Sequence, residues 1–181
     1  MVKEVFNIEK AKAALLFITQ KIGETDLLKI FKILYFAEQK HLAKYGNLII
    51  ADRYIAMKNG PVPSKIYDFF KGLRGDGYVI SEAESFYKAF EITNGYVVTG
   101  KEEPNFDYLS KSNIVCIEDA IRENHTLNFQ QLSDKSHDDA WKNAYRDDAI
   151  NYIDIAKAGG ANDEMLKYIN EYFEIANIEI A

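Results

Sequence analysis

Residues 26–46 read DLLKIFKILYFAEQKHLAKYG and predict a long helix that ends at Gly46. Thr25 is the expected N-cap, and Asp26 in the first turn favours the positive end of the helix dipole. Apolar positions recur in two stripes: Leu27, Ile30, Phe31, Leu34, Ala37 and His41 in the first, and Leu28, Tyr35 and Leu42 in the second. Because a helix that is apolar on two sides is usually buried, we expect this one at the centre of the fold.

Further helices are predicted along most of the chain. Apolar residues at helical spacing cover about 8–22, 63–73, 108–124, 127–133, 148–157 and 162–176. Ser136 and Asp139 form a capping-box pattern that would open another helix, running through Trp141 and Tyr145. Asn162 is the expected cap of the last helix. We therefore expect residues 147–181 to form a helical C-terminal extension.

Strand patterns are confined to the middle of the chain. One strand is expected around residues 54–57, before a turn at Asn59-Gly60-Pro61. A β-hairpin is expected over residues 86–99, where Asn94-Gly95 supplies the positive φ values of a type I′ turn. The pattern predicts an α+β fold that is predominantly α-helical, with a small antiparallel sheet in the middle of the chain.

Length and composition indicate one domain over residues 1–181. The chain of 181 residues is 48% hydrophobic and has no linker-like segment, so a self-sufficient core is expected. No apolar run approaches the ~18 residues of a membrane helix, and the N-terminus lacks the apolar core of a signal peptide. The single cysteine, Cys116, excludes internal disulfides, and a reducing cytoplasm fits this composition.

Charge is distributed unevenly. Residues 1–100 carry 14 Lys and Arg against 11 Asp and Glu, whereas residues 101–181 carry 8 against 17, which gives the net charge of −6. An acidic C-terminal half repels phosphate and favours a basic protein partner.

No pattern of residues predicts catalysis, a cofactor or a metal site. His41, His125 and His137 are far apart and lack partners at ligand spacing, and His137-Asp138-Asp139 is better explained by the dipole of a helix start than by cation binding. His41 is interpreted as a core or boundary histidine with a hydrogen-bond partner. Cys116 lies between Val115 and Ile117, which predicts an inert buried thiol.

Aromatic residues crowd the segments around Gly60-Pro61-Val62. They are Tyr35, Tyr45, Tyr54, Tyr67, Phe69 and Phe70. Core packing explains most of them, but Tyr54 and Tyr67 leave open a second interpretation as a protein-binding surface.

A DNA-binding alternative rests on the order of elements. A helix at 63–73 followed by a hairpin at 86–99 is similar to the helix and wing of winged-helix proteins. The candidate DNA contacts are Lys65, Lys71, Arg74 and Lys88. Acidic residues among them cancel much of the charge, so phosphate neutralisation favours this function only weakly.

Two stretches together resemble a known family. The first comprises LYFAEQKHLAKYG (34–46), DRYIAMKNGPVP (52–63) and Ile66-Tyr67, and the second is LSDKSHDDAW (132–141). In this order they resemble the Panacea domain, the SocA-like antitoxin family that is also met in phage-associated GepA proteins. The resemblance covers about residues 8–146.

The resemblance implies a non-catalytic module that binds and neutralises a toxin encoded by the adjacent gene. A protease such as ClpXP is a further implied partner, to which an adaptor of this kind delivers its toxin, although no docking segment for it is visible. The family-motif or partner-binding positions are Tyr35, His41, Tyr45, Asp52, Tyr54, Gly60, Pro61, Val62, Tyr67, Ser136, His137 and Trp141. As structural roles, we expect Gly60 and Pro61 to fix a turn, Trp141 to fill the core, and His137 to bond to backbone or carboxylate.

Overall fold

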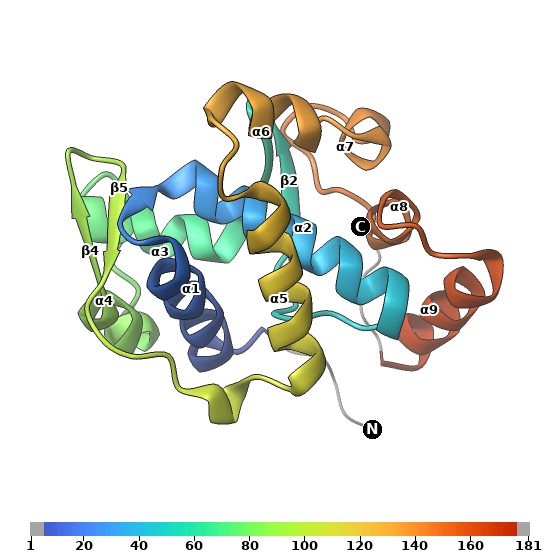
Figure 1. The fold of residues 1–181 in the computed structure, drawn as a ribbon, viewed down its shortest axis with the longest axis horizontal. Coiled ribbons are helices and arrows are strands. Elements are labelled where there is room, and N and C mark those ends of the chain that lie inside the picture. The colour runs from blue at the N-terminus through green and yellow to red at the C-terminus, as the bar shows by residue number, and fades with distance from the viewer. Residues whose placement is uncertain (1–5, 177–181) are drawn as a thin grey trace.

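The computed structural model describes residues 6–176, and its helices surround the long helix α2 (Figure 1). The elements in chain order are α1 (Ile8–Ile22), β1 (Thr25–Asp26), α2 (Leu27–Tyr45), β2 (Tyr54–Met57), β3 (Gly60–Pro63), α3 (Ser64–Arg74), η1 (Ser81–Ala83), α4 (Glu84–Ala89), β4 (Phe90–Thr93), β5 (Val97–Gly100), η2 (Phe106–Tyr108), α5 (Lys111–Asn124), α6 (Phe129–Ser136), α7 (Asp139–Asn143), α8 (Tyr152–Ala158) and α9 (Asp163–Ala176). The predicted α+β class, mostly helical with a small antiparallel sheet, is confirmed.

The central position of α2 is confirmed. It packs against α1, α5, α6, α8 and β3, and both predicted stripes contribute to the core. Ile30 and Leu34 from one stripe and Tyr35 and Leu42 from the other are fully buried. The expected N-cap is wrong by one residue: the carboxylate of Asp26 accepts the Leu28 N–H at 2.7 Å.

The antiparallel sheet has the strand order β1-β5-β4. Its turn is as predicted, because Asn94 and Gly95 have φ values of 53° and 78°. The predicted start of the hairpin is wrong, since residues 84–89 form α4 and the strand begins only at Phe90. Ala83, Phe86 and Ala89 are buried at a spacing of three, so core packing favours a helix over strand alternation there.

Of the second hairpin, β2–β3, the sequence predicts only the first strand. The strand at Tyr54–Met57 is confirmed, but Gly60–Pro63 continues as its antiparallel partner, with Met57 opposite Gly60. Gly60 and Pro61 are therefore strand residues, not the turn itself. Prolines fit here because β3 is an edge strand of a two-stranded ribbon.

The C-terminal helices also require one correction. Ser136 ends α6 and donates its hydroxyl to Ser133 O, while α7 is capped by Asp138, whose carboxylate accepts the Trp141 N–H at 3.0 Å. Asn162 accepts the Met165 N–H, which confirms it as the cap of α9. The predicted extension contains two helices, α8 and α9, up to Ala176, and residues 177–181 lie outside the described part of the chain.

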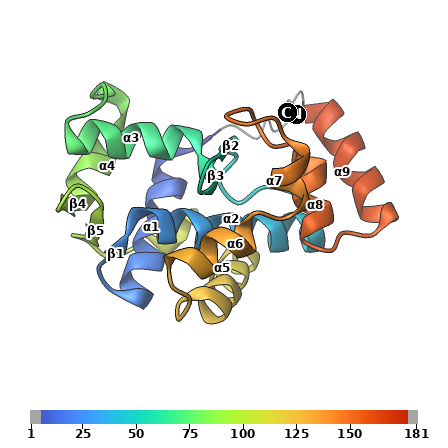
Figure 2. The ribbon, with the colours of Figure 1, turned by 90° about the horizontal axis from the view of Figure 1, so that it is seen from above.

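The other elements are arranged along the axis of α2. Figures 1 and 2 show α3, α4, β4 and β5 at one end of the molecule and α8 and α9 at the other. Across residues 6–176, no helix has the length and apolar character needed to cross a membrane.

Candidate functional site

The two sequence motifs meet in space where α6 and α7 pack on α2 and the β2–β3 hairpin. The hydroxyl of Tyr35 and the amide of Gln39, both on α2, donate to the carboxylate of Asp138, with distances of 3.1 and 2.5 Å to Oδ2. The Trp141 Nε1–H donates to Met57 O at 2.9 Å. These bonds join segments about 100 residues apart, so we call this region the motif junction.

The tightest contact of the motif junction is at Gly60. Its φ is +100°, and a Cβ built there would overlap Ser136 Oγ and lie 2.9 Å from Lys32 Nζ. Only a residue without a side chain fits between α2 and α6 at this point.

We expect Gly60→Ala to lower the free energy of unfolding by about 2 kcal/mol or more, because it adds steric overlap to a strained φ. Urea denaturation measures the change. Gly95→Ala is the matched control, since Gly95 also has a positive φ (+78°) but open space within 4 Å, and we expect it to cost about 1 kcal/mol. Equal losses in the two variants would show that the close contact with Ser136 has no energetic effect.

Two further motif residues are buried and engaged in local structure. Asp52 accepts the backbone N–H groups of Lys65 and Ile66 at 3.0 Å each, which holds the start of α3. Burial raises the pKa of Asp52 to about 6. His41 donates from Nδ1 to Asn47 O at 2.8 Å, while Asn113 donates to its Nε2, and burial lowers the pKa of the imidazole. The prediction of a core histidine is confirmed.

The aromatic residues divide between core and surface. Tyr35 and Tyr54 are fully buried and their rings pack edge to face at 5.3 Å, so Tyr54 does not supply the exposed surface considered for it. Tyr45 and Tyr67 are half-buried. Pro61 and Val62 are buried in β3.

The hydrogen bond expected for the His137 side chain is not formed by its Nε2 atom. That atom is buried without a hydrogen-bond partner in the described structure, and the ring instead stacks on Trp141 at 3.9 Å between centroids. Trp141 is half-buried and packs against the core. Stacking holds this pair at the edge of the motif junction.

The candidate DNA contacts are each engaged by a neighbour. Lys71 pairs with Asp68 at 2.5 Å, Arg74 with Asp76 and Lys88 with Glu84, and Lys65 lies over the ring of Phe6. Lys88 belongs to α4 and not to the hairpin, so the predicted wing lacks its basic residue. The compensated charge does not favour phosphate binding at this surface.

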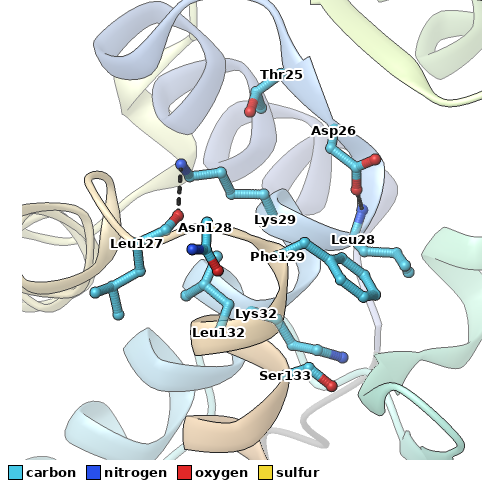
Figure 3. Close-up of a pocket in the computed structure, with 10 residues that line it drawn as sticks. All are labelled: Thr25, Asp26, Leu28, Lys29, Lys32, Leu127, Asn128, Phe129, Leu132 and Ser133. Carbon is cyan, nitrogen blue, oxygen red and sulfur yellow. Dashed lines mark hydrogen bonds between the residues drawn. The ribbon is translucent and has the colours of Figure 1, made fainter.

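A pocket of about 320 Å³ opens between the start of α2 and α6 (Figure 3). Its lining residues are Thr25, Asp26, Leu28, Lys29, Lys32, Leu127, Asn128, Phe129, Leu132 and Ser133. Leu132 and Ser133 begin the second motif, and Ser133 donates to Asn59 O of the hairpin turn at 3.3 Å. We call this hollow the α2–α6 pocket.

Lys32 is the unusual residue of the α2–α6 pocket. It is 2% exposed, and its Nζ donates to Pro61 O at 2.8 Å. Burial lowers its pKa to about 7. Lys32 and Lys29 are not among the residues predicted from the sequence, although a lysine between Phe31 and Ile33, inside an apolar helix, is a signal of a buried cation.

A second hollow of about 310 Å³ is lined by residues of β2 and α7 and of the segments that follow them. Trp141, Ala56 and Ala144 line it together with three cations, Lys58, Lys142 and Arg146. Lys142 and Arg146 face Asp139 and Asp147 at 3.5 and 3.7 Å. We call it the Trp141 hollow.

Other reactive groups are dispersed. In the part of the chain that the structure describes, no three His, Cys, Asp or Glu side chains gather as metal ligands would. Cys116 is buried as predicted, and burial raises the pKa of its thiol to about 11, which disfavours the nucleophilic thiolate.

A comparison with protein-family models matches residues 30–142 to the family described as antitoxin SocA-like, Panacea domain. The match spans more than half of the chain. The protein belongs to this family. No curated protein and no solved structure matches the chain.

The bounds of the Panacea match enclose the motif junction together with α3, α4, β4, β5 and α5. They run from Ile30 on α2 to Lys142 on α7, and so include Lys32, the β2–β3 hairpin and α6. Helices α1, α8 and α9 lie outside the match, although α1 and α8 pack against α2. The matched range therefore contains the hydrogen bonds that join α2, β2 and α7 at the motif junction.

Proposed function

We propose that this Panacea-domain protein neutralises a toxin encoded by the adjacent gene by binding it directly in the cytoplasm. Membership of the antitoxin SocA-like family carries the proposal. A preformed surface for another protein must be rigid. In the motif junction, hydrogen bonds of α7 to α2 and to the β2–β3 hairpin support such rigidity.

The surface over α6 and α7 suits protein binding. It combines partly exposed aromatic residues, Phe129 and Trp141, with cations that line the two hollows. Aromatic anchors and nearby charged groups are typical of residues that dominate binding energy. The motif acids and His41 support a non-catalytic role, because their polar atoms are engaged in caps and core hydrogen bonds.

Co-expression tests the proposal. We expect the adjacent reading frame to arrest growth when expressed alone, and the Panacea-domain protein to restore growth and co-elute with its product as a stoichiometric complex in size-exclusion chromatography. Rescue that persists in a host lacking ClpXP indicates blocking, and rescue that is lost indicates delivery to the protease. Growth arrest that is not relieved, with no complex detected, rejects the proposed function.

A further inference from the structure

Lys32 has bonding capacity that the described structure leaves unused. An ammonium carries three donors, and Pro61 O is its one recorded acceptor within residues 6–176. No carboxylate in that range bonds to it. A buried cation without an anion is unfavourable, because the low-dielectric surroundings replace water without supplying a counter-charge.

The rest of the α2–α6 pocket adds positive charge. Lys29 also lines it and donates to Leu127 O at 3.1 Å. Asp26 is the one acid among the lining residues, and its carboxylate is already engaged by the Leu28 N–H. On α6, the carboxylate of Asp134 accepts from Gln130, and Lys135, which donates to Asn124, is a further cation. The pocket is a local positive site in a chain of net charge −6.

The pocket also has apolar walls. Figure 3 shows Leu127 on one side and Leu28 with Phe129 on the other, while Lys32 and Ser133 reach the wall beneath Phe129. Phe129 is 48% exposed although it lines the pocket. An anionic side chain with apolar neighbours on both sides complements this arrangement, whereas a free chain end has a neighbour on one side only.

We propose that the α2–α6 pocket receives an Asp or Glu side chain of the toxin, flanked by apolar residues, with Lys32 as the anchoring cation and Lys29 as the second. This inference rests on the proposed function and adds to it the chemistry of the bound group. A carboxylate beside Lys32 would provide the missing counter-charge and a charge-assisted hydrogen bond. It would also favour the charged form of an amine whose pKa burial lowers to about 7.

A peptide titration tests the pocket without the toxin. The probe is Ac-Leu-Glu-Leu-NH₂, followed by ¹H–¹⁵N spectra up to about 10 mM, where weak binding of a tripeptide is measurable. We expect saturable shifts at the amides of Lys29, Lys32 and Ser133, and affinity at least about tenfold lower for Ac-Leu-Gln-Leu-NH₂. Lys32→Met should abolish the shifts, while Lys167→Met, which removes an exposed charge on α9, should retain them.

Several results overturn the inference. They are equal binding of the Glu and Gln peptides, unchanged binding in Lys32→Met, no saturable shift at the pocket, and stronger binding of the free chain end in Ac-Leu-Leu-OH or of inorganic phosphate. The toxin complex provides an independent measurement. If the complex forms equally well with Lys32→Met, the pocket inference fails and the proposed function stands. If wild-type protein binds no toxin, the proposed function fails and the peptide titration still decides the pocket.

Discussion

Replacing Asp138 with alanine is expected to lower the free energy of unfolding by about 3 kcal/mol or more. The carboxylate accepts bonds from Tyr35, Gln39 and the Trp141 N–H, and so connects α2 to the start of α7. Its removal leaves the fully buried Tyr35 hydroxyl and the Gln39 amide without this acceptor, at about 1–3 kcal/mol for each unpaired group. Loss of the helix cap adds about 1 kcal/mol.

Asp139 provides a matched control for this prediction. It is the next residue, its side chain is 91% exposed, and its recorded ion pair is a 3.5 Å contact with Lys142. Exposed pairs of this kind contribute about 0–1 kcal/mol, so Asp139→Ala should leave the urea midpoint nearly unchanged. If both variants lose the same stability, the bonds across the motif junction are not what holds α7 in place.

The difference between these two acids shows what the sequence could and could not predict. Both occupy a helix start, and the local pattern assigned the cap to Ser136 because Ser136 and Asp139 have capping-box spacing. Asp138 is the cap because its carboxylate also meets Tyr35 and Gln39, about 100 residues earlier in the chain. Such long-range contacts leave no periodic signal.

Helices α2 and α4 also show which features follow from local sequence and which depend on tertiary packing. The two apolar stripes of α2 predicted its central position correctly, because that property follows from side-chain spacing alone. In α4, the aromatic residues of 86–90 suggested a strand, but packing of Phe86 against Phe69, Phe70 and Phe90 favours the helix. The α2–α6 pocket could not be predicted, because it joins residues 25–32 to residues 127–133.

Replacing Lys32 with methionine is expected to stabilise the free protein at pH 7 by about 2 kcal/mol. Burial lowers the pKa of Lys32 from 10.5 to about 7, and a shift of that size corresponds to an upper bound of roughly 4 kcal/mol against the charged form at neutral pH. Methionine removes this cost, but it also leaves Pro61 O without its donor. That loss destabilises the variant by about 1–2 kcal/mol and offsets part of the gain.

The pH dependence gives the sharper measurement. Between about pH 7 and 10 the unfolded state holds a proton on Lys32 that the folded state has released. The contribution of Lys32 to the free energy of unfolding of the wild-type protein therefore rises with pH. Cys116 and the buried tyrosines have raised pKa values and act in the opposite direction, but they are common to both proteins. The stability advantage of Lys32→Met over wild type should therefore shrink from pH 7 to pH 10 in urea titrations.

This prediction separates two explanations for a buried lysine. A lysine kept for stability should be costly to replace, whereas one kept for binding can destabilise the free protein and be compensated by the partner's carboxylate. If Lys32→Met is more stable than wild type yet loses the Glu peptide, stability and binding oppose each other at this residue. A variant that is less stable at every pH would assign Lys32 to the scaffold, where its bond to Pro61 O holds β3 against α2.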